Sequence, residues 1–197
     1  ADVRLTNSYI AHNANGLDTS NRNGRLSNAA ATVFVRGAQP IIVQNTFDDN
    51  QGATIHINVN ALHSFLRPDT GRSTGLADRL EQFADNAGPL VRLNRIGNDL
   101  RNTAINGMVI RGGTLNTQGV WDDTNIVHVL LDEVFIDNIH AFGGLRIQSS
   151  ATESLVVKLQ GDTAGITAGG HPQDIADRLG GVLHVVGLPG KPVVFTS

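Results

Sequence analysis

Short runs of alternating apolar residues, separated by polar turns, follow one another along most of this chain. The stretch from Val33 to Asn60 contains three such runs, at residues 33–35, 41–43 and 55–57. Glycine, proline and asparagine stand between them, and these residues favour turns because they supply positive φ, a fixed φ or a side-chain-to-backbone hydrogen bond. Strands this short, joined by turns, predict an all-β fold: a parallel β-helix, or solenoid, with inserted loops.

Internal repeats support this prediction. Residues 47–58 recur at 83–94, and residues 33–37 recur at 108–112; the second match continues from 47–49 to 121–123 and from 55–57 to 127–129. In stacked coils with parallel pairing, the aliphatic side chains would alternate inward. Asn50 and Asn86 would then lie at the same corner of neighbouring coils, where asparagine side chains can form ladders. We expect an apolar core lined by six residues: Ile55, Ile57, Val91, Leu93, Val109 and Val127.

Further strands are expected at 126–136, 144–147, 155–159, 182–186 and 193–195. Polar loops are expected at 18–28 and 61–82. Leu76, Leu80, Phe83 and Ala84 follow a helical period, but the repeat also includes Phe83, so at most a short helix precedes it. Residues 171–178 form either one helical turn or a loop. Because no low-complexity linker divides the chain, we expect one β-helical domain over residues 1–197.

The composition fits a turn-rich β protein, with 17% charged residues, 5% aromatic residues and 22 glycines. A net charge of −3 and a pI of about 6.1 provide no electrostatic footprint for nucleic acid. No apolar run is long enough to span a membrane. The absence of cysteine leaves both a cytosolic and an extracellular location open. The chain starts in mid-pattern without methionine, so we expect a fragment or module of a longer protein.

Residues 180–187 and 189–197 resemble the signature GGxLxVxGxxGxPVxFTS, which recurs in large right-handed parallel β-helix surface proteins of environmental bacteria. Residues 109–112 and 143–150 are similar to other segments of those proteins, and the resemblance covers most of the chain from Ala31 onward. It implies right-handed winding, an extracellular or cell-surface location, and a structural or adhesive role. In those proteins further sequence follows the last strand.

Acidic and basic residues are candidates for carbohydrate chemistry. Asp48-Asp49 and Asp122-Asp123 occupy equivalent repeat positions, and Asp132 and Asp137 follow in the second half. Glycosidases need two carboxyl groups across a sugar, but neighbouring residues of an extended chain point to opposite faces. We therefore interpret the pairs as turn residues that cap backbone amides. The arginines next to apolar strands, which could bind anionic sugar, are interpreted as solvent-facing residues or partners of aspartates; they are Arg36, Arg111 and Arg146.

Three histidines, His56, His128 and His184, each occupy the middle of an apolar triplet, and alternation predicts that all three face outward. Stacked outward histidines could bind a metal ion or carbohydrate, but their spacing matches no metal motif. No nucleophile elbow, phosphate loop or dinucleotide fingerprint occurs. We therefore expect no catalytic, cofactor-binding or metal-binding residues.

The expected function is that of a structural or adhesive module in an extracellular fibre or cell-surface protein, which assembles end to end through open β-helix edges. Its expected partners are further copies in a homo-oligomer or filament, with carbohydrate as a second candidate. The alternative is a carbohydrate-active enzyme, either lyase or glycosidase-like. That alternative requires Asp48, Asp122 and Arg111 to converge. A flat carbohydrate- or ice-binding surface would require an outward row of threonines or aromatic residues.

Overall fold

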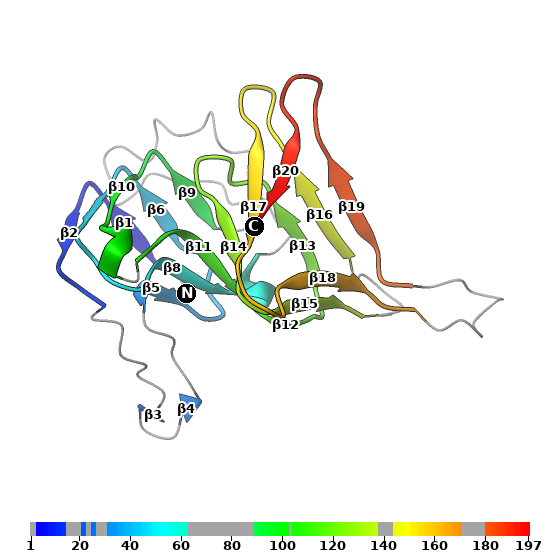
Figure 1. Cartoon of the computed structure of the whole chain (residues 1–197), viewed down its shortest axis with the longest axis horizontal. Coiled ribbons are helices and arrows are strands. Elements are labelled where there is room, and N and C mark those ends of the chain that lie inside the picture. Colours follow the sequence, from blue (N-terminus) through cyan, green and yellow to red (C-terminus); the bar gives the residue numbers. More distant parts are fainter. Residues whose placement is uncertain are drawn as a thin grey trace.

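The computed structural model describes residues 3–14, 21–22, 25–26, 31–62, 89–102, 104–137, 144–170 and 180–197. In this part of the chain the structure is almost entirely β, and all pairs within its five larger sheets are parallel (Figure 1). The expected all-β fold is thus confirmed. Antiparallel pairing occurs in the short pair β3 (Asn21–Arg22) and β4 (Arg25–Leu26) and in one isolated bridge. The helix considered before Phe83, the turn at 171–178 and the corner at Asn86 lie outside the described residues.

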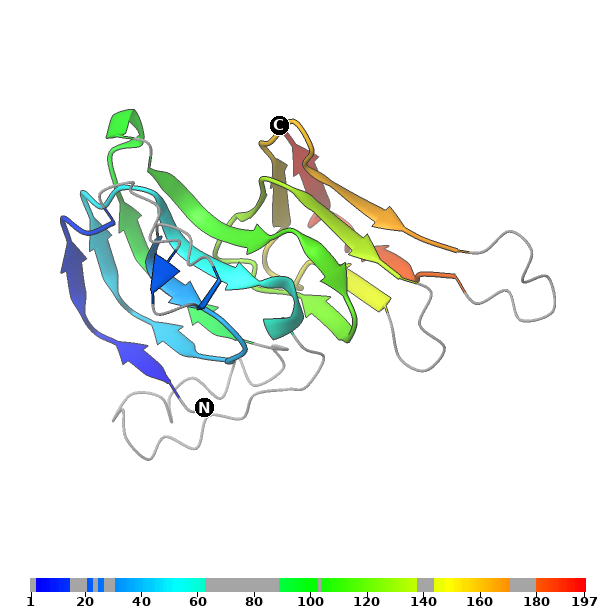
Figure 2. The same ribbon diagram turned by 90° about the horizontal axis from the view of Figure 1, so that it is seen from below.

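One six-stranded sheet runs through both halves of the chain. Its strands, in spatial order, are β20 (Val193–Thr196), β17 (Leu155–Leu159), β14 (His128–Leu130), β11 (Ile105–Arg111), β8 (Ala53–Asn58) and β5 (Ala31–Val35). Their order in space follows their order in the sequence, and the colours run accordingly from blue through green to red across the molecule (Figure 2). The sheet therefore connects the two halves without a break.

Except for β3 and β4, the remaining strands form four three-stranded parallel sheets. The first half of the chain forms β1 (Arg4–Thr6), β6 (Ile41–Val43) and β9 (Leu90–Arg92), and also β2 (Tyr9–Ala11), β7 (Thr46–Asp48) and β10 (Arg95–Gly97). The second half forms β12 (Gly113–Leu115), β15 (Glu133–Ile136) and β18 (Gly165–Ala168), and also β13 (Gln118–Trp121), β16 (Gly144–Gln148) and β19 (Leu183–Val186). Two short 3-10 helices, η1 (Val59–Ala61) and η3 (Leu100–Asn102), complete the described elements.

Within the five larger sheets, consecutive strands enter different sheets before the chain returns to the six-stranded sheet, an arrangement compatible with a β-helix-like fold. No described helix is both long and apolar enough to cross a membrane.

Alternating side chains place the main core between the sheets. Ile55, Ile57 and Val91 belong to this core, as expected. Val109 instead forms a separate apolar cluster, against which Val127 packs. Leu93 is 49% exposed, so its assignment to the core is wrong. The physical reason is local: Leu93 has a φ of 55° and turns the chain after β9, so it leaves the strand alternation.

The strand register confirms one predicted repeat and corrects three others. Residues 33–35 and 108–110 occupy equivalent positions, since both align with 55–57 in adjacent strands. The match of 47–58 to 83–94 is wrong where it can be compared, because β9 pairs with β6 rather than with β8. β7, which holds Phe47, pairs with β2 and β10, whereas β13, which ends at Trp121, pairs with β16 in another sheet, so residues 47–49 do not correspond to 121–123 either. Finally, 55–57 aligns with 128–130 and not with 127–129.

An asparagine ladder follows the three strands of the β1–β6–β9 sheet and holds them in register. The Asn45 side-chain amide donates to the Leu5 carbonyl at 2.8 Å and to Asn94 Oδ1 at 3.0 Å. Its Oδ1 accepts from the Ser8 backbone N–H at 3.0 Å. Asn94 in turn donates to the Ile42 carbonyl at 2.7 Å. Each rung therefore satisfies backbone groups of the neighbouring turn as well as the next side chain.

A second ladder runs through Asn13, Asn50 and Asn98. Asn50 donates to the Ile10 carbonyl at 2.8 Å and to Asn98 Oδ1 at 2.9 Å, while its Oδ1 accepts from the Asn13 side chain at 3.1 Å. Asn98 continues to Thr54 Oγ1 at 3.0 Å. Asn50 therefore stacks with Asn13 and Asn98, while its predicted partner Asn86 lies outside the described residues.

Candidate functional site

His128 lies inside the core, so the expectation that it faces outward is wrong. It is the register partner of Met108 and has no exposed surface. Its ring stacks on Trp121 with centroids 5.7 Å apart and an interplanar angle of 21°. Burial lowers the pKa of His128 to about 4 from 6.5, and the positive charge of Arg92 adds to this effect. The backbone of Ile126 acts in the opposite direction and raises the pKa of His128. Neither ring nitrogen makes a well-formed hydrogen bond. The His128 imidazole is therefore an uncharged core residue packed against Trp121.

The other two histidines lie outside the core and in two different sheets. His56 on β8 packs edge-on against Phe34, with ring centroids 5.6 Å apart. Burial lowers the pKa of His56 to about 4, helped by the positive charge of Arg111. His184 is exposed on β19. The three histidines are not brought together, and among the described residues no group of three His, Cys, Asp or Glu side chains could hold a metal ion.

The paired aspartates have separate structural partners. Asp48 accepts a hydrogen bond from the Tyr9 hydroxyl at 2.6 Å, and Asp49 contacts His12 Nδ1 at 3.0 Å. Asp123 is buried and accepts from the Val91 backbone N–H at 3.2 Å. The interpretation as an amide-capping residue is thus confirmed for Asp123.

The residues required for a carbohydrate-active centre come from different parts of the fold. Asp48 is on β7, Arg111 ends β11, and Asp122 follows β13 in a buried position. These three strands belong to three different sheets. Of the remaining acids, Asp132 accepts from Thr163 Oγ1 at 3.3 Å, and Asp137 follows β15. Among the basic candidates, Arg36 is exposed directly after β5.

Arg92 is a buried polar residue that the sequence pattern did not single out. Its guanidinium donates to Thr124 Oγ1 at 3.0 Å and to the Asp122 carbonyl at 3.4 Å. In the same segment, Asn125 accepts from the Leu93 backbone N–H at 3.2 Å. The chain after β13 therefore lies beside β9 and satisfies its backbone without forming a strand there. In the sequence, Arg92 looks like any solvent-facing residue of an alternating run.

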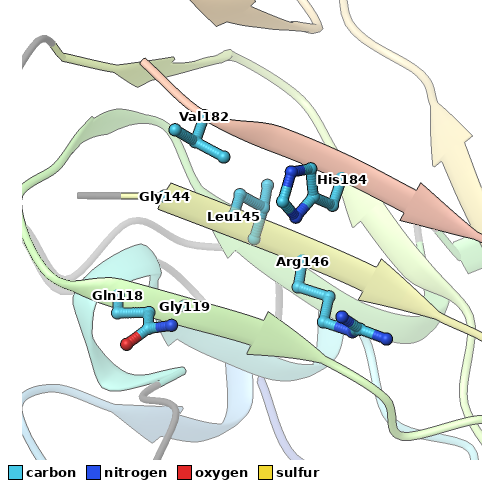
Figure 3. Close-up of a pocket in the computed structure, with 7 residues that line it drawn as sticks. All are labelled: Gln118, Gly119, Gly144, Leu145, Arg146, Val182 and His184. Carbon is cyan, nitrogen blue, oxygen red and sulfur yellow. The ribbon is translucent and has the colours of Figure 1, made fainter. Parts of the chain in front are cut away.

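A shallow depression of about 220 Å³ lies over three neighbouring strands, β13, β16 and β19 (Figure 3). It is lined by Gln118, Gly119, Gly144, Leu145, Arg146, Val182 and His184. Arg146 and His184 are register partners on adjacent strands, and both are exposed. Sequence reasoning named both residues but had no means of pairing them, because the pairing depends on strand register.

Comparisons with known proteins add no family to this picture. No protein-family model matches the chain, and neither a curated protein nor a solved structure matches it. The structure therefore defines the fold class alone, which is that of an all-β protein with parallel sheets.

Proposed function

We propose that this chain is one right-handed parallel β-helical domain that serves as a structural or adhesive module of an extracellular fibre or cell-surface protein. In this proposal it is not an enzyme, and copies assemble end to end. The unbroken six-stranded sheet supports a single domain. Right-handed winding is supported by the strong preference of parallel crossover connections for that hand. The extracellular location is supported by the resemblance of residues 180–197 to bacterial surface proteins.

The observation that carries the proposal is the open apolar surface over β19 and β20. Val185 is 45% exposed, whereas Ile147, its register partner on β16, has no exposed surface. Phe195 is also 45% exposed, whereas its partner Val157 on β17 is fully buried. These side chains continue the columns of the core, yet no described residue covers them. Apolar surface of this kind marks an interaction site.

The backbone at this surface specifies the kind of partner. Within the described residues, β18, β19 and β20 at one end of the stack and β1, β2 and β5 at the other each pair along one edge only. The strands β9, β10, β12 and β13 also have one unpaired edge, but they lie between these two ends. A free strand edge presents unpaired N–H and C=O groups that bind another strand. Since β20 and β5 are the two edges of one parallel sheet, β20 of one copy can pair with β5 of the next. Such a head-to-tail contact does not close on itself and propagates as a filament.

Sedimentation velocity and electron microscopy of the wild-type protein over a concentration series test assembly. We expect filaments or a ladder of oligomers, and we expect Phe195→Asp to shift the population to monomer, because it places a charge in the contact. The matched control is Leu100→Asp on η3, which places the same charge at an apolar residue that is 66% exposed and belongs to neither β20 nor β5. A monomeric wild type, or a Phe195→Asp variant that assembles like wild type, would refute the end-to-end contact.

Location is tested separately. Antibody labelling of intact cells of the source organism should detect the protein at the surface without permeabilisation. Labelling only after permeabilisation would contradict the extracellular assignment.

A further inference from the structure

The depression over β13, β16 and β19 has the geometry of a ligand site on the lateral surface. Strand alternation turns Leu145 and Ile147 into the core and leaves Arg146 between them on the outer face. Gly144 also lines the depression, and a Cβ at this position would lie only 3.3 Å from Val182 Cβ. A side chain at this position would therefore occupy part of the hollow. The hollow thus has a glycine between larger neighbours, and β19, the last strand of this sheet, contributes His184 to its lining.

The chemistry of the lining is cationic and polar. Of the seven lining residues, Arg146 carries a positive charge, His184 and Gln118 offer hydrogen-bonding nitrogen and oxygen atoms, and none is acidic. The Arg146 Nε donates to Gln148 Oε1 at 2.6 Å, which orients the guanidinium plane. Within the described part of the chain its two terminal nitrogens have no partner. Figure 3 shows Arg146 and His184 on neighbouring strands, with Gln118 toward the other end of the hollow.

We propose that this hollow binds the carboxylate of an acidic saccharide, a uronate residue within a polysaccharide. The terminal nitrogens of Arg146 would hold the carboxylate in the bidentate geometry that guanidinium favours. His184 and Gln118 would exchange hydrogen bonds with ring hydroxyl groups, and Val182 would contact an apolar face of the sugar. One cation matches one carboxylate, and the open, shallow shape lets a chain of sugars enter and leave on both sides.

Calorimetric titration of the protein with trigalacturonate tests the site. We expect binding that is lost when the ligand is fully methyl-esterified, because esterification removes the charge but keeps the hydroxyl groups. Arg146→Gln should weaken binding about tenfold or more, and Arg146→Lys should not restore it fully, because lysine lacks the planar fork. The matched control is Arg95→Gln on β10, an exposed arginine on another sheet, which should bind like wild type.

Several outcomes would overturn the inference. They are no binding by the wild type, equal binding by Arg146→Gln, equal binding of the methyl ester, or equal competition by millimolar sulfate, which would reveal a general anion site. The inference goes beyond the proposed assembly and does not rest on it. The titration is therefore repeated with Phe195→Asp, which should bind the saccharide whether or not it forms filaments.

Discussion

Met108 on β11 and His128 on β14 are register partners, so an imidazole occupies a position in the core that neighbouring strands fill with aliphatic side chains. Ile55 and Val33 continue the same column across β8 and β5. The histidine is tolerated because it stays neutral and stacks on Trp121.

We predict that acid destabilises the fold through His128. The folded-state pKa is about 4 and the ordinary value is 6.5, so between these pH values the unfolded chain binds more protons than the folded one. The contribution of His128 to the free energy of unfolding is therefore fully present above pH 6.5. It is lost as the pH decreases toward 4, which lowers the free energy of unfolding by roughly 3 kcal/mol. Urea unfolding across this pH range measures the effect.

Two variants separate His128 from other titrating groups. His128→Leu should flatten the pH dependence, while His184→Gln, at an exposed position, should keep it. His56, whose pKa is also lowered to about 4, contributes in the same direction, so some slope should remain in His128→Leu. A His128→Leu variant with the full wild-type slope would contradict this account.

We predict that Asn50→Ala destabilises the protein by roughly 3 kcal/mol. The change removes the side-chain partner of the Ile10 carbonyl and of the Asn13 backbone N–H, and unpaired buried polar groups are costly. Asn98 Oδ1 loses one of its two bonds to residue 50 and keeps the bond from the backbone N–H. Asn116→Ala, at an exposed asparagine, is the control and should change the free energy of unfolding by less than about 0.5 kcal/mol. Similar unfolding curves for the two variants would show that the ladder contributes little.

We predict that Gly161→Ala is destabilising by about 1–3 kcal/mol or more. A Cβ at Gly161 would lie 1.7 Å from the Leu131 carbonyl oxygen, so the two adjacent backbone segments would have to separate. Gly165→Ala is the matched control, because no atom lies within 4 Å of a Cβ at that position. Thermal unfolding compares the two, and equal melting temperatures would contradict the close approach.

We predict no turnover of pectin, alginate or related uronate polysaccharides, because the carboxylates considered for catalysis come from different sheets. Assays for unsaturated products and for reducing ends after long incubation test this. Turnover that disappears in Asp122→Asn would instead support the enzyme alternative.

The positions of strands and corners could be read from local pattern alone. Alternation at 33–35, 41–43 and 55–57 predicted three strands that the structure contains, and the turn residue Asn50 predicted a corner with a side-chain ladder. The run at 126–136 was less informative, because it divides into β14 and β15 around a turn. Arg146 and His184 were recognisable as candidates, but their common hollow was not.

The sequence by itself determined the all-β character, the short strands and the turns between them, because these depend on period-two alternation and on residues with special backbone preferences. Only the tertiary structure decided the register. By sequence, residues 55–57 match 127–129, since both are apolar–His–apolar triplets, but the strand register aligns them with 128–130. This shift of one residue turns His128 from the surface into the core. In the same way, the long-range pairing of β9 with β6 placed Arg92 inside. Local sequence carries no record of such pairings, since the strands that meet are separated by insertions of unequal length.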